Sequence, residues 1–209
     1  MDERFLAVDR GSAYAGQMAS QLSSIPRKSL NTRQMETVER LFTAAGELLD
    51  EFGHEQVTIR TVASRAGVSP ATAYTYFASK EHLFAELFWR LLVSSPVPEL
   101  TGGTATARTQ QMAADLARLI ADAPALAAAV NKGLLGSDPE VQRLRLAIGG
   151  LWVDRFRDAI GEDADPDLIT SLVFALSGAL LQAGMGILAY DELPDFLDKT
   201  VAVIMRGNE

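Results

Sequence analysis

Hydroxyl, aromatic and basic side chains gather in residues 58–84, TIRTVASRAGVSPATAYTYFASKEHLF. Between residues 56 and 80 the charged side chains are Arg60, Arg65 and Lys80, with no Asp or Glu among them. Hydroxyl groups can reach phosphates or base edges, and a small methyl group can pack on the methyl of thymine. The stretch therefore predicts a locally positive surface that contacts the major groove of DNA.

Two breaks divide the stretch into short helices that would position these groups. Thr58 is a favourable N-cap for a helix that ends at Gly67, where a glycine can turn the chain with a positive φ. Ser69 and Pro70 then supply an N-cap and a first helical position for a helix that runs to Phe77. These signals predict a helix-turn-helix whose second helix projects outward.

The second helix of this motif has two distinct faces. Ala73 and Phe77 are four residues apart and are expected to face inward. The opposite face is uncharged and holds Ala71, Thr72, Thr75 and Tyr76.

The segment TVASRAGVSPATAYTYFASKEHL resembles the DNA-binding domain of TetR-family transcriptional regulators, and the resemblance covers about residues 33–92. The matching positions are Thr58, Ala63, Ala66, Gly67, Val68, Ser69, Thr72, Tyr74, Tyr76, Phe77, Ser79, Lys80, Glu81 and Leu83. Ala71 and Ala73 stand where many members carry Gly and Leu. The resemblance implies phosphate contacts at Thr58, Arg60, Tyr74 and Lys80. It implies operator contacts at Ser69, Ala71, Thr72, Thr75 and Tyr76.

Plainer interpretations of some residues stay open. Tyr74 would also suit core packing with its hydroxyl at the surface, and Arg60 would also suit a solvated helix surface. Arg27, Lys28 and Arg33 would either reach a phosphate or the minor groove, or belong to a solubilising arm.

Apolar residues at helical spacing predict an all-α chain. The predicted helices cover about residues 31–52, 58–66, 70–77, 80–94, 105–121, 124–134, 139–160, 166–189 and 192–206. We expect a flexible N-terminal arm over residues 1–32 and a three-helix helix-turn-helix DNA-binding domain over residues 33–93. A larger C-terminal helical bundle, residues 94–209, would serve ligand binding and dimerisation.

The formal net charge of −8 at first argues against a nucleic-acid partner, because a surface that binds phosphate is usually basic, but the charge is unevenly distributed along the chain. Residues 94–209 hold nine Lys or Arg against sixteen Asp or Glu, whereas residues 27–93 hold eight of each. The absence of cysteine excludes disulfides and thiolate metal sites. We expect a cytoplasmic protein, because the first residues are partly acidic and lack the apolar core of a signal peptide.

Residues 168–190 carry no charged side chain, and this run is long enough to span a bilayer. Polar residues and glycines interrupt the run and its flanks are acidic, so we expect a buried helix rather than a membrane span. In the resembling family the last two long helices pair with their copies. The resemblance therefore implies a homodimer through the helices at about residues 166–189 and 192–206.

The resemblance also implies a pocket for a small-molecule effector in the C-terminal half. The candidate lining residues are Phe88, Met112, Leu116, Trp152, Phe156, Phe174, Leu181 and Met185, each of which would also suit plain core packing. No cofactor or metal is expected, because the histidines, His54 and His82, lie in the N-terminal region. The acidic cluster at 163–167 lacks the ligands of a calcium loop, and Asp165 instead predicts a helix N-cap.

The chain has no glycine-rich phosphate loop, H-E-x-x-H or nucleophile-elbow motif, so no motif supports an enzyme. The sequence predicts a ligand-responsive, DNA-binding transcriptional regulator. Our hypothesis is a repressor that binds double-stranded DNA at a palindromic operator as a dimer and is released by a small apolar effector. The alternatives are a helical enzyme and a membrane-associated helical protein.

Overall fold

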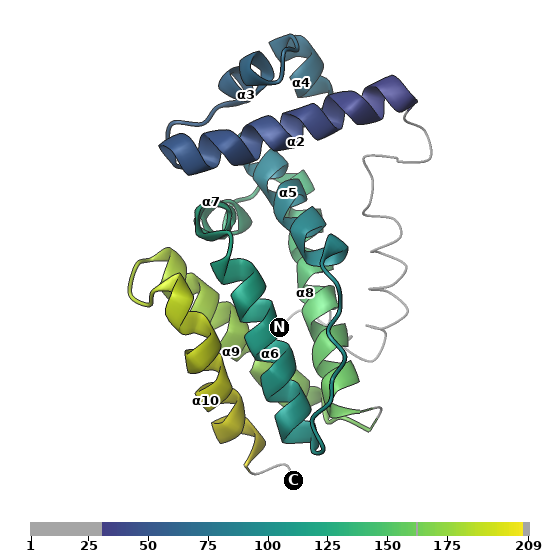
Figure 1. Ribbon diagram of the computed structural model, residues 1–209, viewed down its shortest axis with the longest axis vertical. Coiled ribbons are helices and arrows are strands. Elements are labelled where there is room, and N and C mark those ends of the chain that lie inside the picture. The colour runs from purple at the N-terminus through teal and green to yellow at the C-terminus, as the bar shows by residue number, and fades with distance from the viewer. Residues whose placement is uncertain (1–30, 162, 207–209) are drawn as a thin grey trace. The chain divides into compact units, whose positions relative to one another are not determined.

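The computed structural model describes residues 31–161 and 163–206, and every regular element in these ranges is a helix (Figure 1). The prediction of an all-α chain is confirmed. Residues 1–30 of the arm expected over 1–32, with Arg27 and Lys28, lie outside the described residues. The last two residues of that range are the N-cap and the first residue of a helix.

The described residues form two compact units that interleave along the chain. One unit takes residues 31–95 and 124–145, and the other takes residues 96–123 and the described residues from 146 onward. The helix over residues 139–160 therefore contributes its first turns to one unit and the rest to the other. The predicted boundary at residues 93 and 94 divides the chain by function rather than by compactness. The functions assigned to the two sides of that boundary stay predictions.

The first unit is built on α2 (Thr32–Phe52), which begins with a capping box between Asn31 and Gln34. It also contains the helices α3 (Ile59–Arg65), α4 (Pro70–Tyr76), α5 (Lys80–Ser94) and α7 (Pro124–Leu134) and the start of α8 (Pro139–Ile160). Gly53, with φ of 69°, ends α2 where the sequence predicted a stop. Figure 1 shows α3 and α4 beside α2.

Arg90 ties α5 to α2 within this unit. Its two terminal nitrogens each donate to a carboxylate oxygen of Glu39 at 2.8 Å. The guanidinium carbon also lies 4.5 Å from the centre of the Phe42 ring. This combination of a bidentate ion pair and a cation–π contact fixes the helix that follows the predicted DNA-reading segment.

The second unit contains α6 (Ala105–Ala121), most of α8, α9 (Pro166–Gly184), the short 3₁₀ helix η3 (Tyr190–Glu192) and α10 (Leu193–Met205). α10 packs against both α6 and α9. Arg108 of α6 satisfies the end of α8, donating to the carbonyls of Ala159 at 2.9 Å and Ile160 at 3.1 Å. A cation at a helix C-terminus also suits the negative end of the helix dipole.

One predicted helix was too long. The helix expected over 166–189 ends at Gly184, because Gly186 takes a φ of 73° and turns the chain. The amide of Ile187 then donates to the Gln182 carbonyl at 3.0 Å, which closes the helix end with a Schellman motif. The remaining residues, 185–189, form a turn that leads into η3 rather than further α-helix.

By length and composition alone, α9 could cross a membrane. A core helix of a folded domain passes the same test. Leu172, Leu176 and Leu180 of α9 are buried, and α10 packs on this helix. The fold therefore gives α9 a packing partner for one side.

Candidate nucleic-acid interface

The turn between α3 and α4 is a Schellman motif. Gly67 has a φ of 66°, and its amide donates to the Ser64 carbonyl at 3.2 Å. The amide of Val68 donates to the Ala63 carbonyl at 2.9 Å, completing the motif. This turn satisfies the end of α3 and lets the next helix begin three residues later, as the sequence predicted.

The start of α4 is also fixed by residues close to it in sequence. The Ser69 hydroxyl accepts from the Thr72 amide at 3.1 Å, and Pro70 occupies the first turn, where no amide is needed. Likewise, Thr58 and Thr61 form a capping box at the start of α3. The N-caps predicted at Thr58 and Ser69 are confirmed, and Ser79 caps α5 by accepting from the His82 amide.

The inner face of α4 packs as expected. Ala73 is 1% exposed and Phe77, just after the helix, is 0% exposed. The Phe77 ring meets the Phe42 ring of α2 edge-on, with 5.3 Å between the ring centres. These two residues seat α4 on the unit, so the remaining side chains of the helix point elsewhere.

The other face of α4 carries the predicted operator contacts. Ser69, Ala71 and Thr75 are exposed, whereas Thr72 and Tyr76 are half-buried. Tyr74 is 50% exposed, so it is a surface side chain with part of its ring covered. The structure thus brings these six residues together on one short segment that is open to a partner.

The Ser and Thr hydroxyls on this face already have local partners. The Ser69 and Thr72 oxygens are 2.8 Å apart, and the Thr75 hydroxyl donates to the Ala71 carbonyl at 3.0 Å. A hydroxyl has a single proton to donate. Thr75 therefore offers a partner its methyl group and an oxygen lone pair.

Arg65 differs from its expected role in a locally positive face. Its terminal nitrogens donate to both Glu51 carboxylate oxygens at 2.8 Å, and one of them also lies 3.3 Å from Glu47. The hydrogen bond from Arg65 lowers the pKa of Glu51, and these bonds raise the pKa of Arg65. Its charge is offset within the unit, and its guanidinium holds α3 on α2.

The predicted phosphate contacts have different surroundings. Arg60 and Thr58 are exposed, and Thr58 is engaged in its capping box. Lys80 is half-buried, and its ammonium donates to the His54 carbonyl at 3.0 Å. An ammonium has three protons, so this bond leaves two for a phosphate. All four implied phosphate contacts stay predictions.

Sequence reasoning missed two long-range contacts that hold the motif together. The Arg40 guanidinium of α2 donates to the carbonyl of Ala66, at the end of α3, at 3.2 Å. Asp138 accepts from the Ser79 hydroxyl at 2.7 Å and from the Glu140 amide at 2.9 Å, so one carboxylate joins the N-terminal ends of α5 and α8. Both contacts join residues far apart in sequence, and no local pattern signals them.

The eight predicted effector-lining residues fall into two groups. The buried group contains Phe88, Met112, Leu116, Trp152 and Phe156. Phe88 belongs to the unit that holds α4, and the other four belong to the second unit. The exposed group, on α9 and the turn after it, contains Phe174, Leu181 and Met185. Five of the eight residues are thus buried and three are exposed, and the contact of all eight with an effector stays a prediction.

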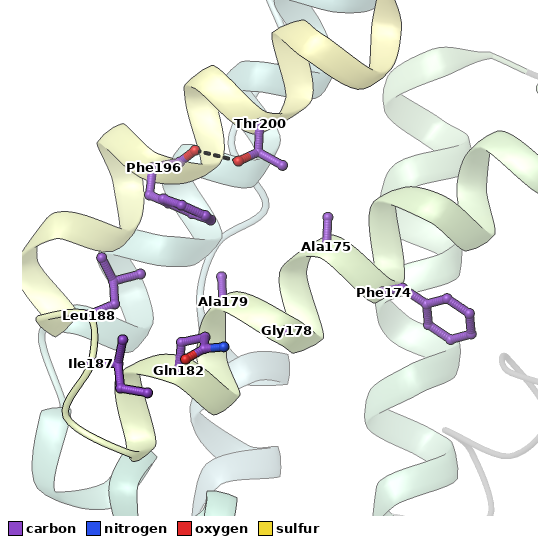
Figure 2. A pocket seen from close by; sticks show the side chains of 9 residues that line it. All are labelled: Phe174, Ala175, Gly178, Ala179, Gln182, Ile187, Leu188, Phe196 and Thr200. Carbon is purple, nitrogen blue, oxygen red and sulfur yellow. Dashed lines mark hydrogen bonds between the residues drawn. The ribbon is translucent and has the colours of Figure 1, made fainter.

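A hollow of about 550 Å³ lies along the outer side of α9 and α10. Figure 2 shows Phe196 and Thr200 on α10 facing Ala175 and Ala179 on α9. Gln182, Ile187 and Leu188 line the same hollow. Among the predicted effector contacts, Phe174 lines it, with its ring pointing away from α10 (Figure 2).

The exposed apolar residues of this region recur at helical spacing. They are Phe174, Leu181 and Met185 in the α9 region, Ile187 in the turn, and Phe196 and Val203 on α10. Phe174 is 59% exposed and Val203 is 62% exposed. Two adjacent helices thus present apolar side chains on their outer faces, which marks a surface that another protein surface could cover.

Within the described residues, no three His, Cys, Asp or Glu side chains come together to hold a metal ion. In the acidic cluster at 163–167, Asp165 accepts from the Asp167 amide at 2.8 Å and is the N-cap of α9. The predicted capping role of Asp165 is confirmed.

Comparisons with known proteins agree with this architecture. The sequence profile of the family described as bacterial regulatory proteins, tetR family, matches residues 41–87. A helix-turn-helix (HTH)-type transcriptional regulator of Mycobacterium bovis is 40% identical over 181 residues, which cover 86% of this chain and 85% of that protein. The HTH-type transcriptional repressor KstR of Mycolicibacterium smegmatis is 30% identical over 137 residues, or 64% of this chain and 67% of that protein.

Solved structures share the fold. A TetR transcriptional regulator from Rhodococcus sp. RHA1 has a TM-score of 0.66 and 21% identity, covering 85% of this chain and 100% of the other. Thermus thermophilus FadR, a repressor crystallised with lauroyl-CoA, has a TM-score of 0.63 and 22% identity, covering 82% and 95%. At these identities the likeness establishes the helical architecture and leaves the ligand of each neighbour a property of that neighbour.

Proposed function

The chain belongs to the TetR family of bacterial transcriptional regulators, and from this premise we propose that it is a repressor that binds a palindromic operator as a homodimer and is released by a small apolar effector. The family consists of regulators rather than enzymes. Repression is supported by the relative KstR, which is itself named a repressor. A cytoplasmic location follows from the same proposal, because the operator is in the cytoplasm of a bacterium.

One observation carries the proposal. The short helix α4 rests on buried Ala73 and Phe77 and leaves an uncharged face, centred on Ala71 and Thr75, open to a partner. A helix held in this way behind a preceding helix is the arrangement that enters the major groove in helix-turn-helix proteins. The absence of acidic side chains from α3 and α4 removes repulsion by phosphate.

The homodimer would form through the outer faces of α9 and α10. Phe174, Phe196 and Val203 are large apolar side chains that the described chain leaves exposed. A two-fold axis places the same patch on both partners, so apolar side chains meet apolar side chains. The same axis would present two copies of α4 to half-sites in successive major grooves, about 34–36 Å apart.

The effector site would lie in the C-terminal half, where Met112, Leu116, Trp152 and Phe156 are buried apolar side chains. Bulky and flexible apolar groups suit an apolar ligand. Two solved FadR neighbours were crystallised with lauroyl-CoA and stearoyl-CoA, which makes these thioesters the first compounds to test. Binding would shift the population between two states that differ in the separation of the two α4 helices.

The decisive experiment is selection of binding sites from a pool of random duplexes by the purified full-length protein. We expect enrichment of a palindrome, a complex with two chains per duplex, and affinity that falls as salt rises. Tyr76→Ala should change the preference at one or two base pairs by about 1–3 kcal/mol. Failure to enrich any sequence at low salt contradicts the proposal.

Effector release is measured separately with the selected operator. Addition of lauroyl-CoA or stearoyl-CoA to the preformed complex should dissociate it if an acyl thioester is the effector. Coenzyme A alone is the control for binding through the polar headgroup. A complex that both thioesters leave intact removes this ligand class and directs the search to other apolar compounds.

A further inference from the structure

The reading helix α4 lacks every side chain that makes two hydrogen bonds to one base. Its sequence is PATAYTY, without Arg, Lys, Asn or Gln. Guanine is most often read by Arg or Lys on its O6 and N7, and adenine by Asn or Gln on its N6 and N7. From this absence we propose that α4 selects its operator by packing methyl groups against thymine methyls, so that the base pairs it reads directly are A·T pairs. The inference rests on the proposed function and specifies its DNA target.

Neighbouring cations do not replace the missing donors. Arg65 is held by Glu51 and Glu47 at 2.8–3.3 Å. Lys80 follows α4 and donates to the His54 carbonyl, and Arg60 lies at the second position of α3. In helix-turn-helix proteins the helix that precedes the reading helix crosses the DNA backbone, so Arg60 is placed for a phosphate rather than a base edge.

The hydroxyls of α4 are poor substitutes for an amide or a guanidinium. The Thr75 proton is used by the Ala71 carbonyl, and Ser69 and Thr72 share one hydrogen bond between their oxygens. The Ser69–Thr72 pair therefore keeps one free proton between its two hydroxyls. Tyr74 and Tyr76 each add one phenolic proton, which can make a single hydrogen bond but cannot grip O6 and N7 together.

Methyl groups dominate what remains on this face. Ala71 and Thr75 are exposed and four residues apart, so the Ala71 methyl and the Thr75 γ-methyl lie on one side of the helix. Thr72 adds a half-buried γ-methyl beside them. In the major groove the apolar feature of the base pairs is the C5 methyl of thymine, so these side chains match thymine in kind.

The test uses the full-length protein and the operator that it selects. Each thymine of a half-site is replaced in turn by uracil, which pairs identically but lacks the methyl group. We expect affinity to fall about fourfold for each thymine methyl that the protein touches, the loss that corresponds to one buried methyl group. Thymines outside the half-sites should tolerate uracil without loss.

Variants of the protein then identify the partner of each methyl. Thr75→Ser keeps the hydroxyl and removes the γ-methyl, and Ala71→Gly removes the other exposed methyl. Each variant should bind the thymine operator more weakly and lose sensitivity to uracil at one position. Thr43→Ser is the matched control, because Thr43 is exposed on α2 and its hydroxyl donates to the Glu39 carbonyl in the same way.

The outcomes separate this inference from the proposed function. Enrichment of no sequence overturns the proposed function. Enrichment of a palindrome whose half-sites tolerate uracil throughout overturns the thymine inference while leaving the regulator intact. Half-sites in which guanine is required at every directly read position overturn it as well. Uracil sensitivity that Thr75→Ser or Ala71→Gly abolishes, and that Thr43→Ser retains, establishes methyl readout.

Discussion

Arg65 and Glu51 form a two-pronged ion pair across the first two helices of the DNA-binding unit. Nη1 lies 2.8 Å from Oε1, and Nη2 lies 2.8 Å from Oε2. The pair joins residues 14 positions apart, from the end of α3 to the last turn of α2. It gives Arg65 a role in positioning the motif, in place of the role in DNA contact that its acid-free surroundings suggest.

Replacing Arg65 distinguishes these two roles. Arg65→Gln should weaken operator binding because α3 loses its tie to α2, while the slope of log affinity against log salt stays unchanged. If Arg65 bound a phosphate, its replacement would instead reduce that slope by about 1.8 in a dimer, at about 0.9 for each phosphate contact. Exchange of the pair, Arg65→Glu with Glu51→Arg, should recover binding. Recovery would fail if Arg65 touched phosphate, since a carboxylate would then face the DNA backbone.

Replacing Lys80, unlike replacing Arg65, should change the salt dependence of operator binding. The ammonium keeps two protons beyond its bond to the His54 carbonyl, so a phosphate can join it. Lys80→Ala should weaken binding uniformly across operator sequences and reduce the salt slope by about 1.8 in a dimer, at about 0.9 for each neutralised phosphate. Titrations by fluorescence anisotropy at several salt concentrations measure the slope. Lys132→Ala, which removes the lysine paired with Glu55, serves as the control and should leave the slope unchanged.

Phe77 anchors α4, and its replacement should lower the stability of the unit. The ring is 0% exposed and meets Phe42 edge-on. Phe77→Ala should lower the free energy of unfolding by about 3–5 kcal/mol, as is typical of a buried aromatic truncated to alanine. Phe52, which is 49% exposed, is the control, and Phe52→Ala should cost about 0.5 kcal/mol or less. Equal losses in urea unfolding would show that Phe77 is not part of the core.

Asp138 makes the junction of α5 and α8 sensitive to acid. Hydrogen bonds from Ser79 and from the backbone lower the pKa of this carboxyl below its ordinary value of 3.8. A depressed folded-state pKa means that the stabilisation is complete above that ordinary value and is lost as the pH falls through the lower, folded-state value. Because Asp138 is half-buried and solvent still screens its carboxylate, the contribution is about 1 kcal/mol or less.

Urea unfolding of the protein and of Asp138→Asn measures this contribution across a pH series. The native protein should be the more stable of the two at pH 7, and the difference should shrink below about pH 4. Ser79→Ala should show a smaller acid dependence than the native protein. A stability difference that is the same at every pH would contradict the assignment.

The outer faces of α9 and α10 should govern oligomeric state. Phe174→Glu or Val203→Glu would place a carboxylate in the proposed apolar interface, where it loses its water. Each variant should raise the dimer dissociation constant at least about tenfold, as measured by light scattering after size exclusion. Leu146→Glu introduces the same charge at a position on α8 that is 65% exposed, and it should leave the dimer intact. Dissociation by all three variants would point to a general loss of stability.

The helix ends near the reading motif were predictable because their chemistry is local. Thr58 and Ser69 accept from amides three residues ahead, and Gly67 turns the chain through its own φ. Such signals lie within one turn of a helix and can be read directly from the sequence. The inward face of α4 was also predictable, because Ala73 and Phe77 are four residues apart and so lie on the same side of a helix.

Features that depend on the packing of distant segments could not be predicted from the sequence. The bonds of Arg65 to Glu51 and of Ser79 to Asp138 join separate helices, and periodicity carries no information about which helices meet. From Leu168 to Gly184 of α9 no charged side chain marks an outer face, so composition could not separate buried Leu176 from exposed Phe174. The predicted effector set mixed the two kinds of position for that reason.

The inward placement of Ala73 and Phe77 also bears on how such a regulator changes its targets over time. The residues that seat α4 are distinct from Ala71 and Thr75, which face outward. On the proposed function, a substitution at either outward position would alter what the helix recognises and leave the buried contacts of Ala73 and Phe77 unchanged. After gene duplication, one copy could therefore come to control new promoters through a few point mutations. None of the intermediate variants would need to lose the folded structure.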